Sequence, residues 1–342
     1  MILGEIMNKI KYYIGRLFNL SFKEFFKTIK IVSERSGKNK IIIFFDIIIC
    51  SLKYQSGYVD YRIFYFEELS SKQRKTFVTR GINNSYIKAM NDPKYFDSFN
   101  NKVKFNKIFS KYIGRDYVYL DNNYEEFLSF VKKHKTILVK PIDLKCGKNI
   151  EKIIIKKTTN LKTLYKKLIT NKQLLVEQYI IQSKEMNKLF PNSVNSLRIV
   201  AGYKNGKSKI LFRAIRIGNG KNVVDNFNHG GMYSVISEQG IITNPAIDRQ
   251  GNIYEKHPVT KTPISGFKIP YFKEALKMIE TVSKKIPEVG LVGWDIAITD
   301  QGPILIEGNQ YPGYDIYQSK IHLNDDKTGV RPIFDEFIFN KK

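Results

Sequence analysis

Cysteine is scarce in this chain of 342 residues, where only Cys50 and Cys146 occur, far apart in the sequence. Two distant cysteines give no disulfide framework, so the composition favours a reducing compartment. Long apolar runs are lacking as well. The longest, residues 41–52, is far shorter than the roughly 20 residues that span a bilayer, and it contains Asp46. No small-residue cleavage site follows this run, so we do not expect a signal peptide.

Acidic residues are few relative to basic ones: 32 Asp and Glu against 57 Lys and Arg give a formal net charge of +25. Such a balance attracts polyanions such as nucleic acid, anionic membranes or phosphorylated substrates. A composition rich in Asn, Ile, Lys and Tyr explains the charge equally well, because it places Lys on every solvated surface. No nucleic-acid-binding motif accompanies the charge, so no nucleic-acid partner is expected.

Hydrophobic residues make up 42% of the chain and aromatic residues 13%, which predicts a folded protein with a large core. Residues 1–75 are predicted to be helical, with breaks at Ser36-Gly37 and at residues 55–57. Within residues 8–30, Lys is mixed with Phe, Leu, Ile and Tyr at near-helical spacing. This pattern fits a helix lying on an anionic membrane and a helix packed against its own protein about equally well. The expectation is therefore a cytoplasmic protein, with residues 1–52 as a candidate peripheral contact to the inner face of the cell membrane.

Strand-like segments dominate from about residue 134 onward. The sequence predicts strands over residues 136–139, 150–155, 174–180, 196–203, 210–217, 291–298 and 304–306. Asn205-Gly206 predicts a tight hairpin between two of these strands. Helices are predicted over residues 160–170, with Asn160 as the cap, and over residues 271–285.

Acidic residues embedded in apolar runs near the C-terminus form the clearest candidate site. Asp295 lies within LVGWDIAI, and Glu307 and Asn309 lie within PILIEGN. If the two runs pair in a hairpin, these three side chains can project from one face. Two carboxylates and an amide oxygen are hard ligands suited to Mg²⁺. The alternative is a solvated hairpin, which explains poorly why acids interrupt apolar strands.

Four segments of the chain closely resemble the ATP-grasp ligases associated with sugar transfer, whose relatives act in polysaccharide biosynthesis. These segments are RAIRI (213–217), NVVDNFNHGG (222–231), GWDIAIT (293–299) and GPILIEGN (302–309). The resemblance extends from about residue 60 to the C-terminus and is strongest over residues 190–313. It implies an α/β (α+β) ATP-grasp fold with an N-terminal helical region, and ATP and Mg²⁺ as cofactors. The implied parts are a helical region (1–75), the first part of the ATP-grasp core (76–133), a lid (134–185) and a C-terminal subdomain with the Mg-ATP and substrate site (186–342).

The resemblance also implies roles for five residues that bind nucleotide. Lys140 is similar to the lysine that contacts the α- and β-phosphates, and Lys102 to the first nucleotide-contacting lysine of the fold. Glu177 matches the hinge that reads adenine, and Glu185 matches the acid that binds ribose. Gly147 lies in the loop that closes over the phosphates, although this loop is less Gly-rich than is usual in the family.

Arg198 and Arg216 lie in predicted strands, where a buried guanidinium is costly unless it is paired. The planar fork of arginine suits phosphate and carboxylate oxygens. The resemblance implies that Arg216 stabilises the γ-phosphoryl group during transfer and that Arg198 holds substrate or phosphate. A structural ion pair with an acid is the alternative for both. His229 beside Gly230-Gly231 is a candidate substrate contact, although a lone loop histidine is more often structural.

The mechanism implied by the resemblance is carbon–nitrogen ligation, with Lys140, Arg198 and Arg216 as catalytic residues. ATP phosphorylates a substrate carboxylate, ADP leaves, and an amine displaces phosphate. The expected partners are a small-molecule or lipid-linked sugar precursor of a capsule or other surface polysaccharide, such as a uronic acid, and an amine or amino acid. Two alternatives remain: a kinase acting on a sugar hydroxyl, and a non-catalytic protein that binds polyanions or membranes.

Overall fold

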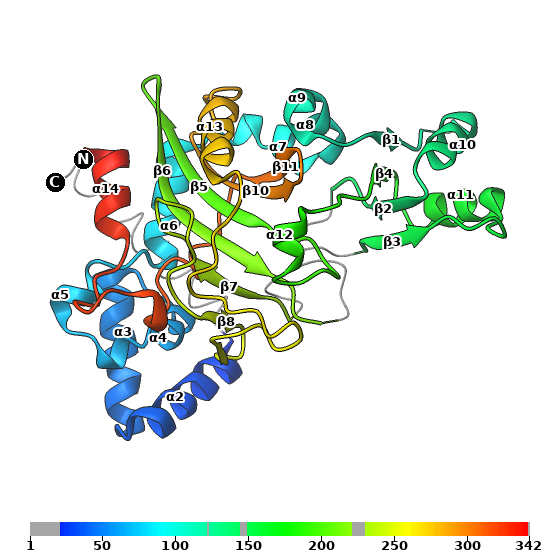
Figure 1. The fold of residues 1–342 in the computed structure, drawn as a ribbon. Helices are drawn as coiled ribbons and strands as arrows, with labels where there is room; N and C mark the ends of the chain where they lie inside the picture. The colour runs from blue at the N-terminus through cyan, green and yellow to red at the C-terminus, as the bar shows by residue number, and fades with distance from the viewer. Residues whose placement is uncertain (1–20, 122, 144–148, 221–229, 341–342) are drawn as a thin grey trace. The chain divides into compact units, whose positions relative to one another are not determined.

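The structure of the protein is a computed structural model that describes residues 21–121, 123–143, 149–220 and 230–340. The chain folds into two compact units, coloured along the chain in Figure 1. The first unit comprises Met1–Ser85 and Tyr317–Arg331, and the second comprises Tyr86–Ile316 and Pro332–Lys342. A C-terminal segment therefore belongs to the same unit as the N-terminal helices.

Helices build the first unit, as predicted for the described part of residues 1–75. Asn39 caps the start of α3 (Lys40–Tyr54), where its side chain accepts a hydrogen bond from Ile41 N. Gly37 (φ 70°) ends α2 (Phe22–Ser36) in the left-handed conformation, and Gln55 (φ 53°) ends α3 in the same way. The two predicted breaks are therefore confirmed. The unit also contains α4 (Tyr58–Ile63), η1 (Phe66–Glu68), α5 (Ser71–Arg74) and η4 (Lys320–His322).

Aromatic side chains form the interior of the first unit. The ring of Phe66, which is fully buried, lies 5.4 Å from that of Phe77 and 6.1 Å from that of Tyr61 between centroids. Asp46 interrupts the apolar run of α3, but its carboxylate accepts hydrogen bonds from Arg74 Nη1 at 2.7 Å, Arg74 Nη2 at 2.8 Å and Tyr61 Oη at 2.6 Å. This bidentate pairing explains how an acid is accommodated between apolar residues.

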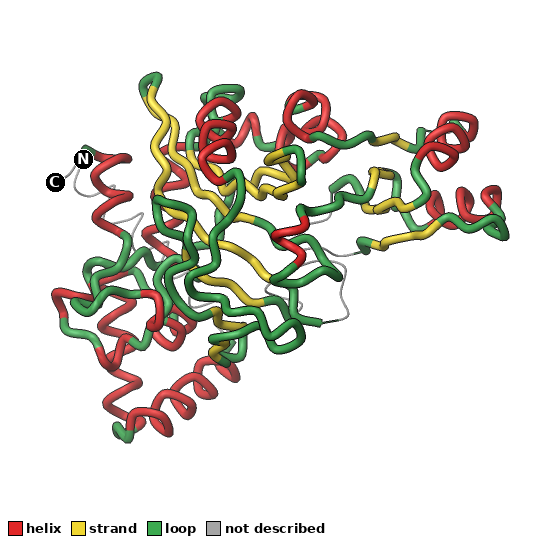
Figure 2. The backbone as a smooth tube through the Cα atoms, viewed as in Figure 1, coloured by secondary structure: helices red, strands yellow, loops and turns green. Residues whose placement is uncertain are grey.

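Two antiparallel sheets organise the described part of the second unit (Figure 2). The larger sheet has seven strands in the order β11-β10-β5-β6-β7-β8-β9. Their bounds are β5 (Leu197–Lys204), β6 (Lys207–Ile217), β7 (Met232–Val235), β8 (Ala246–Asp248), β9 (Ile253–Tyr254), β10 (Leu291–Thr299) and β11 (Gly302–Asn309). Asn205 (φ 52°) and Gly206 (φ 78°) form the turn between β5 and β6, which confirms the predicted hairpin.

The smaller sheet has four strands in the order β1-β4-β2-β3. They are β1 (Tyr117–Tyr119), β2 (Thr136–Lys140), β3 (Glu151–Ile154) and β4 (Leu175–Gln178). Helices α10 (Tyr124–Lys133) and α11 (Leu161–Thr170) contribute Phe127 and Leu168 to its hydrophobic core. Asn160 caps α11 by accepting a hydrogen bond from Thr163 N at 3.0 Å, as predicted. Strand β1 belongs to the small sheet and α10 packs against it, although both precede residue 134, where the sequence analysis began the lid.

One face of the large sheet packs against helices, and together they form a hydrophobic core. Trp294 on β10 is 1% exposed, and its ring contacts those of Phe99 and Phe109. The same core takes Ile279 from α13 (Phe272–Val282). The other helices with residues in this unit are α6 (Arg80–Met90), η2 (Pro93–Tyr95), α7 (Asp97–Asn100), α8 (Lys102–Ile108), α9 (Ser110–Ile113), α12 (Lys184–Asn187) and α14 (Arg331–Phe339). Mixed helix and antiparallel sheet confirms the expected fold class.

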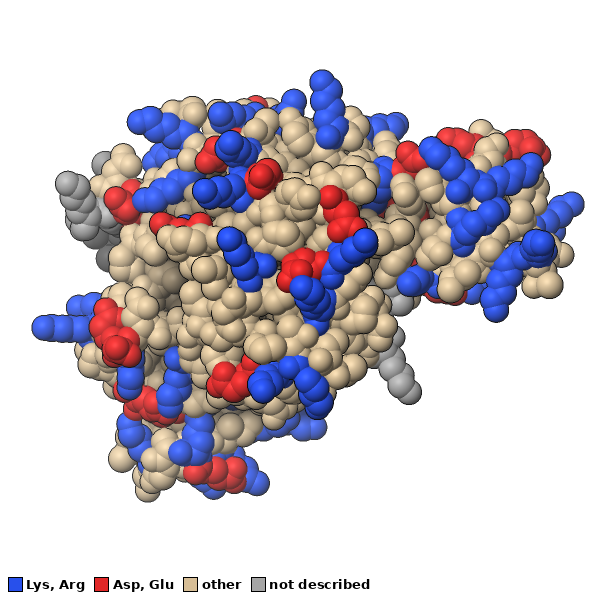
Figure 3. All heavy atoms as spheres, in the orientation of Figure 1, with Lys and Arg blue, Asp and Glu red and all other residues tan. Residues whose placement is uncertain are grey.

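Lys and Arg side chains are spread over the whole face of the molecule shown in Figure 3 and do not gather in a single patch there. Among the residues that the structure describes, no helix is long and apolar enough to cross a membrane.

Candidate active site

The predicted carboxylate pair lies on the face of the large sheet opposite Trp294. Strands β10 and β11 form the expected hairpin, in which Asp295 stands directly opposite Glu307 and Gly293 opposite Asn309. The two carboxylates are close enough to share a hydrogen bond. Asp295 is 3% exposed, whereas Glu307 is open to solvent. The hairpin therefore places two acids and an amide on one face, as predicted.

A β-bulge in β11 is what turns Glu307 toward this face. Leu305 pairs with Ile296 and Glu307 pairs with Asp295, so Ile306 is an extra residue with no partner opposite it. In an unbroken strand, residues two apart share a face, and Glu307 would then point with Leu305 into the hydrophobic core. A bulge re-aims the side chains that follow it. The orientation of Glu307 thus depends on one inserted residue.

Arginines from the two neighbouring strands converge on Asp295. Arg198 on β5 is the cross-strand neighbour of Asp295 and donates from Nε to Oδ1 at 2.5 Å and from Nη2 to Oδ2 at 2.9 Å. Arg216 on β6 donates from Nη1 to Oδ2 at 3.1 Å. Arg198 is 3% exposed, while the Arg216 side chain is 17% exposed. Arg198 therefore orients Asp295, and Arg216 is the more accessible of the two cations.

Gly293 leaves room for the buried guanidinium. A Cβ at this position would lie 3.3 Å from Arg198 Cδ and 3.1 Å from Pro312 Cβ, tighter than most carbon contacts in proteins. The glycine of the GWDIAIT segment is therefore a packing requirement of the Arg198–Asp295 pair.

The two acids differ in electrostatic environment. Burial alone would raise the pKa of Asp295, but the charges of Arg198 and Arg216 lower it below its usual value. The pKa of Glu307 is raised, first because neighbouring protein limits hydration of its carboxylate even though its surface is accessible, and then because of the negative charge on Asp295. Two adjacent carboxylates, with only one of them paired to arginine, make a surface that favours a cation.

A second acid–base cluster lies in the small sheet around Glu177 on β4. Its carboxylate contacts Lys140 Nζ at 2.7 Å, Arg115 Nε at 3.0 Å and Asn106 Nδ2 at 2.9 Å. Glu177 is 1% exposed and Lys140 is 6% exposed. Burial alone would raise the pKa of Glu177, but the charges of Arg115 and Lys140 lower it strongly. The structure thus pairs two residues that the sequence analysis assigned to adenine and to phosphate.

Arg115 was not predicted from the sequence. Its guanidinium bridges Glu177 and the bulged part of β11, donating from Nη1 to Leu305 O at 2.7 Å and from Nη2 to Ile306 O at 3.1 Å. Arg115 precedes β1 in an ordinary polar stretch, so no local motif marks it. The one available signal is indirect, since an acid such as Glu177 in an apolar strand requires a buried cation.

Lys102, at the start of α8, lies next to Lys140. Its Nζ donates to Ile142 O at 3.3 Å. Burial lowers the pKa of Lys102, and the positive charge of Lys140 lowers it further. Glu307 also interacts electrostatically with both lysines. The predicted phosphate-binding lysines and the predicted metal-binding carboxylates therefore belong to one connected region.

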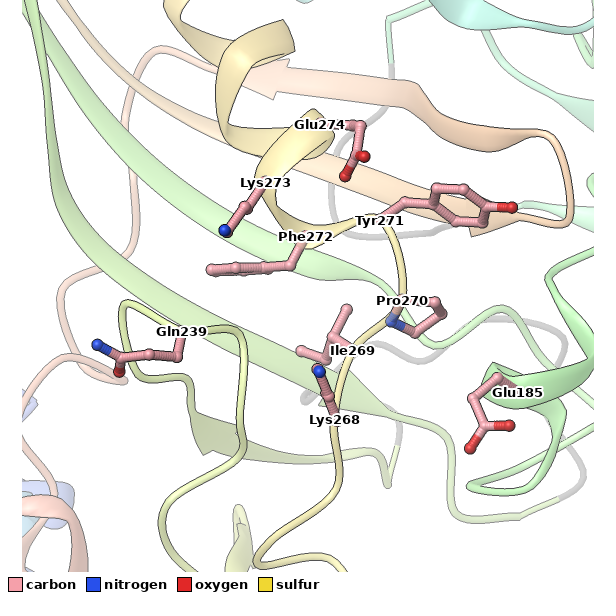
Figure 4. Close-up of a pocket in the computed structure, with 9 residues that line it drawn as sticks. All are labelled: Glu185, Gln239, Lys268, Ile269, Pro270, Tyr271, Phe272, Lys273 and Glu274. Atoms are coloured by element: carbon pink, nitrogen blue, oxygen red, sulfur yellow. The ribbon is translucent and has the colours of Figure 1, made fainter.

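Glu185 lies in a different setting. It lies in the first turn of α12 and pairs with Lys188 at 2.6 Å. Figure 4 shows it beside an open cavity of about 450 Å³ that is also lined by Gln239, Lys268 and Tyr271. None of the residues lining this cavity belongs to the clusters around Asp295 and Glu177. Gly147 and His229 lie outside the described residues.

The chemistry of the residues around Asp295 fits a divalent cation. In the described part of the chain, no group of three or more His, Cys, Asp or Glu side chains is placed to hold a metal ion. The set on this face instead combines the carboxylates of Asp295 and Glu307 with the amide of Asn309, whose Oδ1 also accepts a hydrogen bond from Tyr311 N at 3.0 Å. Oxygen donors of this kind suit Mg²⁺, which keeps part of its water shell.

Comparison with protein families matches residues 81–322 to the family described as sugar-transfer associated ATP-grasp. This range covers both sheets and every residue of the two clusters. The chain belongs to the sugar-transfer associated ATP-grasp family. Membership confirms the family and the ATP-grasp fold that the sequence resemblance implied. No curated protein matches the chain.

Solved structures similar to this ATP-grasp protein are distant. The ATP-grasp ligase PsnB complexed with its minimal precursor is 12% identical, with a TM-score of 0.43 over 74% of this chain and 64% of that one. D-alanyl-alanine synthetase A from Vibrio cholerae is 14% identical, with a TM-score of 0.42 over 71% and 64%. The ADP complex of N5-carboxyaminoimidazole ribonucleotide synthetase is 10% identical, with a TM-score of 0.41 over 65% and 48%. This chain therefore spans less than two thirds of each of these proteins.

Proposed function

We propose that this protein is an ATP-dependent carboxylate–amine ligase that works through an acyl-phosphate. The observation that carries the proposal is the row Glu307–Asp295–Arg198 across three neighbouring strands. Arg216 contacts Asp295 in this row, and Lys102 and Lys140 interact electrostatically with Glu307. The cations that we assign to phosphate and the acids that we assign to a metal ion thus share one region. This combination serves transfer of a phosphoryl group, where catalysis consists mainly of positioning and charge stabilisation.

Asp295, Glu307 and Asn309 would hold Mg²⁺, which when bound neutralises charge on the ATP phosphates. Lys102 and Lys140 bind phosphate oxygens, and Glu177 holds the Lys140 amine in place through their 2.7 Å contact. Arg216 is the accessible guanidinium of the region and stabilises negative charge on the γ-phosphoryl group as it moves. Arg198 acts through Asp295, which it fixes in a bidentate pair.

The proposed reaction has two steps. A carboxylate oxygen of the substrate attacks the γ-phosphorus of ATP, an O–P bond forms, the β–γ bridging P–O bond breaks, and ADP leaves. An amine nitrogen then attacks the acyl carbon, the C–N bond forms, the C–O bond to phosphate breaks, and the nitrogen loses a proton. Exclusion of water protects the acyl-phosphate from hydrolysis between the steps. We assign this protection to the lid proposed over residues 134–185.

The proposed substrates are a sugar-containing precursor of a surface polysaccharide, such as a uronic acid, and an amino acid or other amine. Support for the sugar comes from the association of the family with sugar transfer. The substrate pair is to be found by screening.

The test is ADP release measured over a panel of sugar carboxylates against amino acids and amines. We expect ADP and inorganic phosphate only when a carboxylate is present, with hydroxylamine trapping the acyl-phosphate as a hydroxamate when the amine is omitted. Glu307→Gln should lack both signals, which controls for contaminating ATPases. AMP and pyrophosphate as products would overturn the mechanism. ADP formation with a neutral sugar, stable phosphate transfer and no amine dependence would identify a kinase instead.

A further inference from the structure

Exposed apolar side chains gather on two helices of the first unit. Eight of the twenty exposed large hydrophobic residues in the described chain lie on α2 and α3, which have 15 residues each. They are Phe22, Phe26, Ile41, Ile42, Phe45, Ile48, Ile49 and Leu52. Each is at least 38% exposed, and Ile41 reaches 66%. We call these eight side chains the apolar surface.

Helix α3 is apolar on two opposite sides. Ile43, Ile47, Cys50 and Tyr54 recur at helical spacing and are buried in the first unit. The exposed residues Ile41, Phe45, Ile48 and Leu52 recur at the same spacing on the other side. A helix that is apolar all round is normally buried on all sides. The second side of α3 therefore lacks the polar residues of a surface that faces water.

The apolar surface continues from α3 onto α2. Phe25 and Phe44 pack edge to face at 5.7 Å between centroids, and each also contacts the neighbouring exposed ring, Phe26 or Phe45. These ring contacts link the exposed rings of the two helices through Phe25, which is buried, and Phe44. All residues of the apolar surface come from the described part of the chain.

Positive charge borders this surface. Lys23, Lys27 and Lys30 form a stripe at i, i+4 and i+7 on α2, next to the stripe of Phe22 and Phe26. The Lys27 and Lys30 side chains are 60% and 67% exposed, and each forms a long ion pair on the surface of the helix, Lys27 with Glu24 at 4.0 Å and Lys30 with Glu34 at 3.8 Å. Lys53 stands at the end of α3 beside Ile49 and Leu52. An apolar surface edged by lysines matches the acyl and headgroup layers of an anionic membrane.

We propose that the apolar surface of α2 and α3 docks on anionic lipid, with the lysines of α2 contacting headgroups. The proposal is independent of the proposed ligase chemistry. It extends the sequence prediction for residues 1–52 to a defined face of residues 22–53, and residues 1–20 lie outside the described part.

The test is flotation of the full-length protein with phosphatidylcholine vesicles, with and without phosphatidylglycerol, at low and high salt. We expect binding only to the anionic vesicles, weakened at high salt. The double substitution Phe45→Ser and Ile49→Ser should lower the bound fraction at least tenfold. The control, Ile253→Ser with Val259→Ser, replaces similarly exposed residues of the second unit and should leave the bound fraction unchanged. A triple variant of the α2 lysines should weaken binding: Lys23→Gln, Lys27→Gln and Lys30→Gln. The control removes the same charge from the second unit and should bind like wild type: Lys157→Gln, Lys162→Gln and Lys166→Gln.

Several results would overturn membrane docking. Wild-type protein that ignores anionic vesicles at low salt rules it out directly. Binding that appears only after deletion of residues 1–20 would show that this segment covers the surface. A dimer in solution that Phe45→Ser dissociates, without vesicle binding, would make a second copy of the chain the occupant. Equal loss of binding in both triple-lysine variants would show that binding depends on the net charge of the protein and not on the lysines of α2.

A second inference concerns the bulge that aims Glu307. Arg115 is 7% exposed and donates to the carbonyls of Leu305 and Ile306, the residues at the bulge. The same guanidinium contacts Glu177, which holds Lys140. We infer that Arg115 is a positioning residue that fixes Glu307 and Lys140 relative to each other. This inference rests on the proposed function, because it assumes that Glu307 binds the cation and Lys140 the phosphates.

Arg115→Lys tests this role, because lysine keeps the buried charge but cannot contact two carbonyls and a carboxylate at once. The readout is Mn²⁺ binding followed by the electron paramagnetic resonance signal of the free ion, with thermal unfolding in parallel. We expect Mn²⁺ affinity to fall about tenfold, as for other residues that orient metal ligands. Lower stability with unchanged Mn²⁺ affinity would make Arg115 purely structural. Failure of the proposed function itself is distinguishable, since wild type and Glu307→Gln would then bind Mn²⁺ equally.

Discussion

The two acid–base clusters of the second unit use the same residue types for different ends. Around Glu177, one buried carboxylate contacts both Lys140 and Arg115, so every charged side chain of this cluster has a partner within the protein. Around Asp295, two carboxylates lie beside two arginines. Both guanidinium groups contact Asp295, and the Glu307 side chain stays open to solvent. Complete pairing fixes geometry, whereas incomplete pairing leaves a group that can bind a cation. Arg115 connects the two clusters.

The largest effect should follow from removing the charge of Glu307, the solvent-exposed acid of the Asp295 cluster. Glu307→Gln keeps the size of the side chain but removes a metal ligand, and we expect ATP turnover to fall about 10³-fold because the cation contributes several kcal/mol. Stability should stay within about 0.5 kcal/mol of wild type, as for most exposed positions. Glu336→Gln, at an exposed ion pair with Lys209, is the matched control. ADP release at the wild-type rate by folded Glu307→Gln protein would refute the metal assignment.

Removing the charge of Glu177, the buried acid of the other cluster, should act on stability first. Glu177→Gln leaves Lys140 and Arg115 buried without a counter-charge, so we expect the free energy of unfolding to drop by about 3 kcal/mol. Glu151→Gln in the same sheet breaks an exposed pair with Lys167, at 3.3 Å, and should change it by less than about 1 kcal/mol. Urea denaturation of both variants measures the difference. Equal small losses would show that the Glu177 cluster tolerates an unbalanced charge and contradict the comparison.

Arg216→Lys sharpens the difference between the two arginines of the Asp295 cluster. Because we assign Arg216 to charge that develops in the transition state, kcat should fall about 10²-fold with the KM for ATP nearly unchanged. Arg213→Lys is the control, since Arg213 lies on the same strand and pairs with exposed Glu238. A loss confined to ATP affinity would make Arg216 a ground-state ligand. Unchanged kinetics would leave it with only its structural pairing to Asp295.

The smallest effect should come from Glu185, which belongs to neither cluster. If it binds ribose, as the family resemblance implies, Glu185→Gln removes one hydrogen bond worth about 1 kcal/mol, and the KM for ATP rises about fivefold with kcat unchanged. Steady-state kinetics at varied ATP concentration give both constants. An unchanged KM would assign Glu185 to the separate cavity of Figure 4 rather than to the nucleotide.

Features that depend on neighbours in the chain were predictable. Gly37, Asn39 and Asn160 mark helix ends because their side chains or their backbone freedom act within a few residues. Asn205-Gly206 specifies its turn for the same reason. Asp295 and Glu307 stood out because acids interrupt apolar strands, and the hairpin joins those strands through a short local loop.

Features that depend on distant segments were not predictable. Arg115 and Glu177 are 62 residues apart, and the pairing of Lys140 with Glu177 follows from the order of strands in the small sheet. The bulge at Ile306 has no sequence signature, although it decides which face Glu307 occupies.

The sequence by itself therefore determined the helix ends at Gly37 and Asn160, the two hairpins and the set of ionisable residues, because backbone preference and apolar periodicity act over short distances. Only the tertiary structure decided which charges are paired and which are left open, because burial brings together cations and acids from strands far apart in the chain. It also decided that one apolar side of α3 is buried and the other is exposed. Periodicity shows that a helix is apolar all round, but packing alone selects the side that is covered.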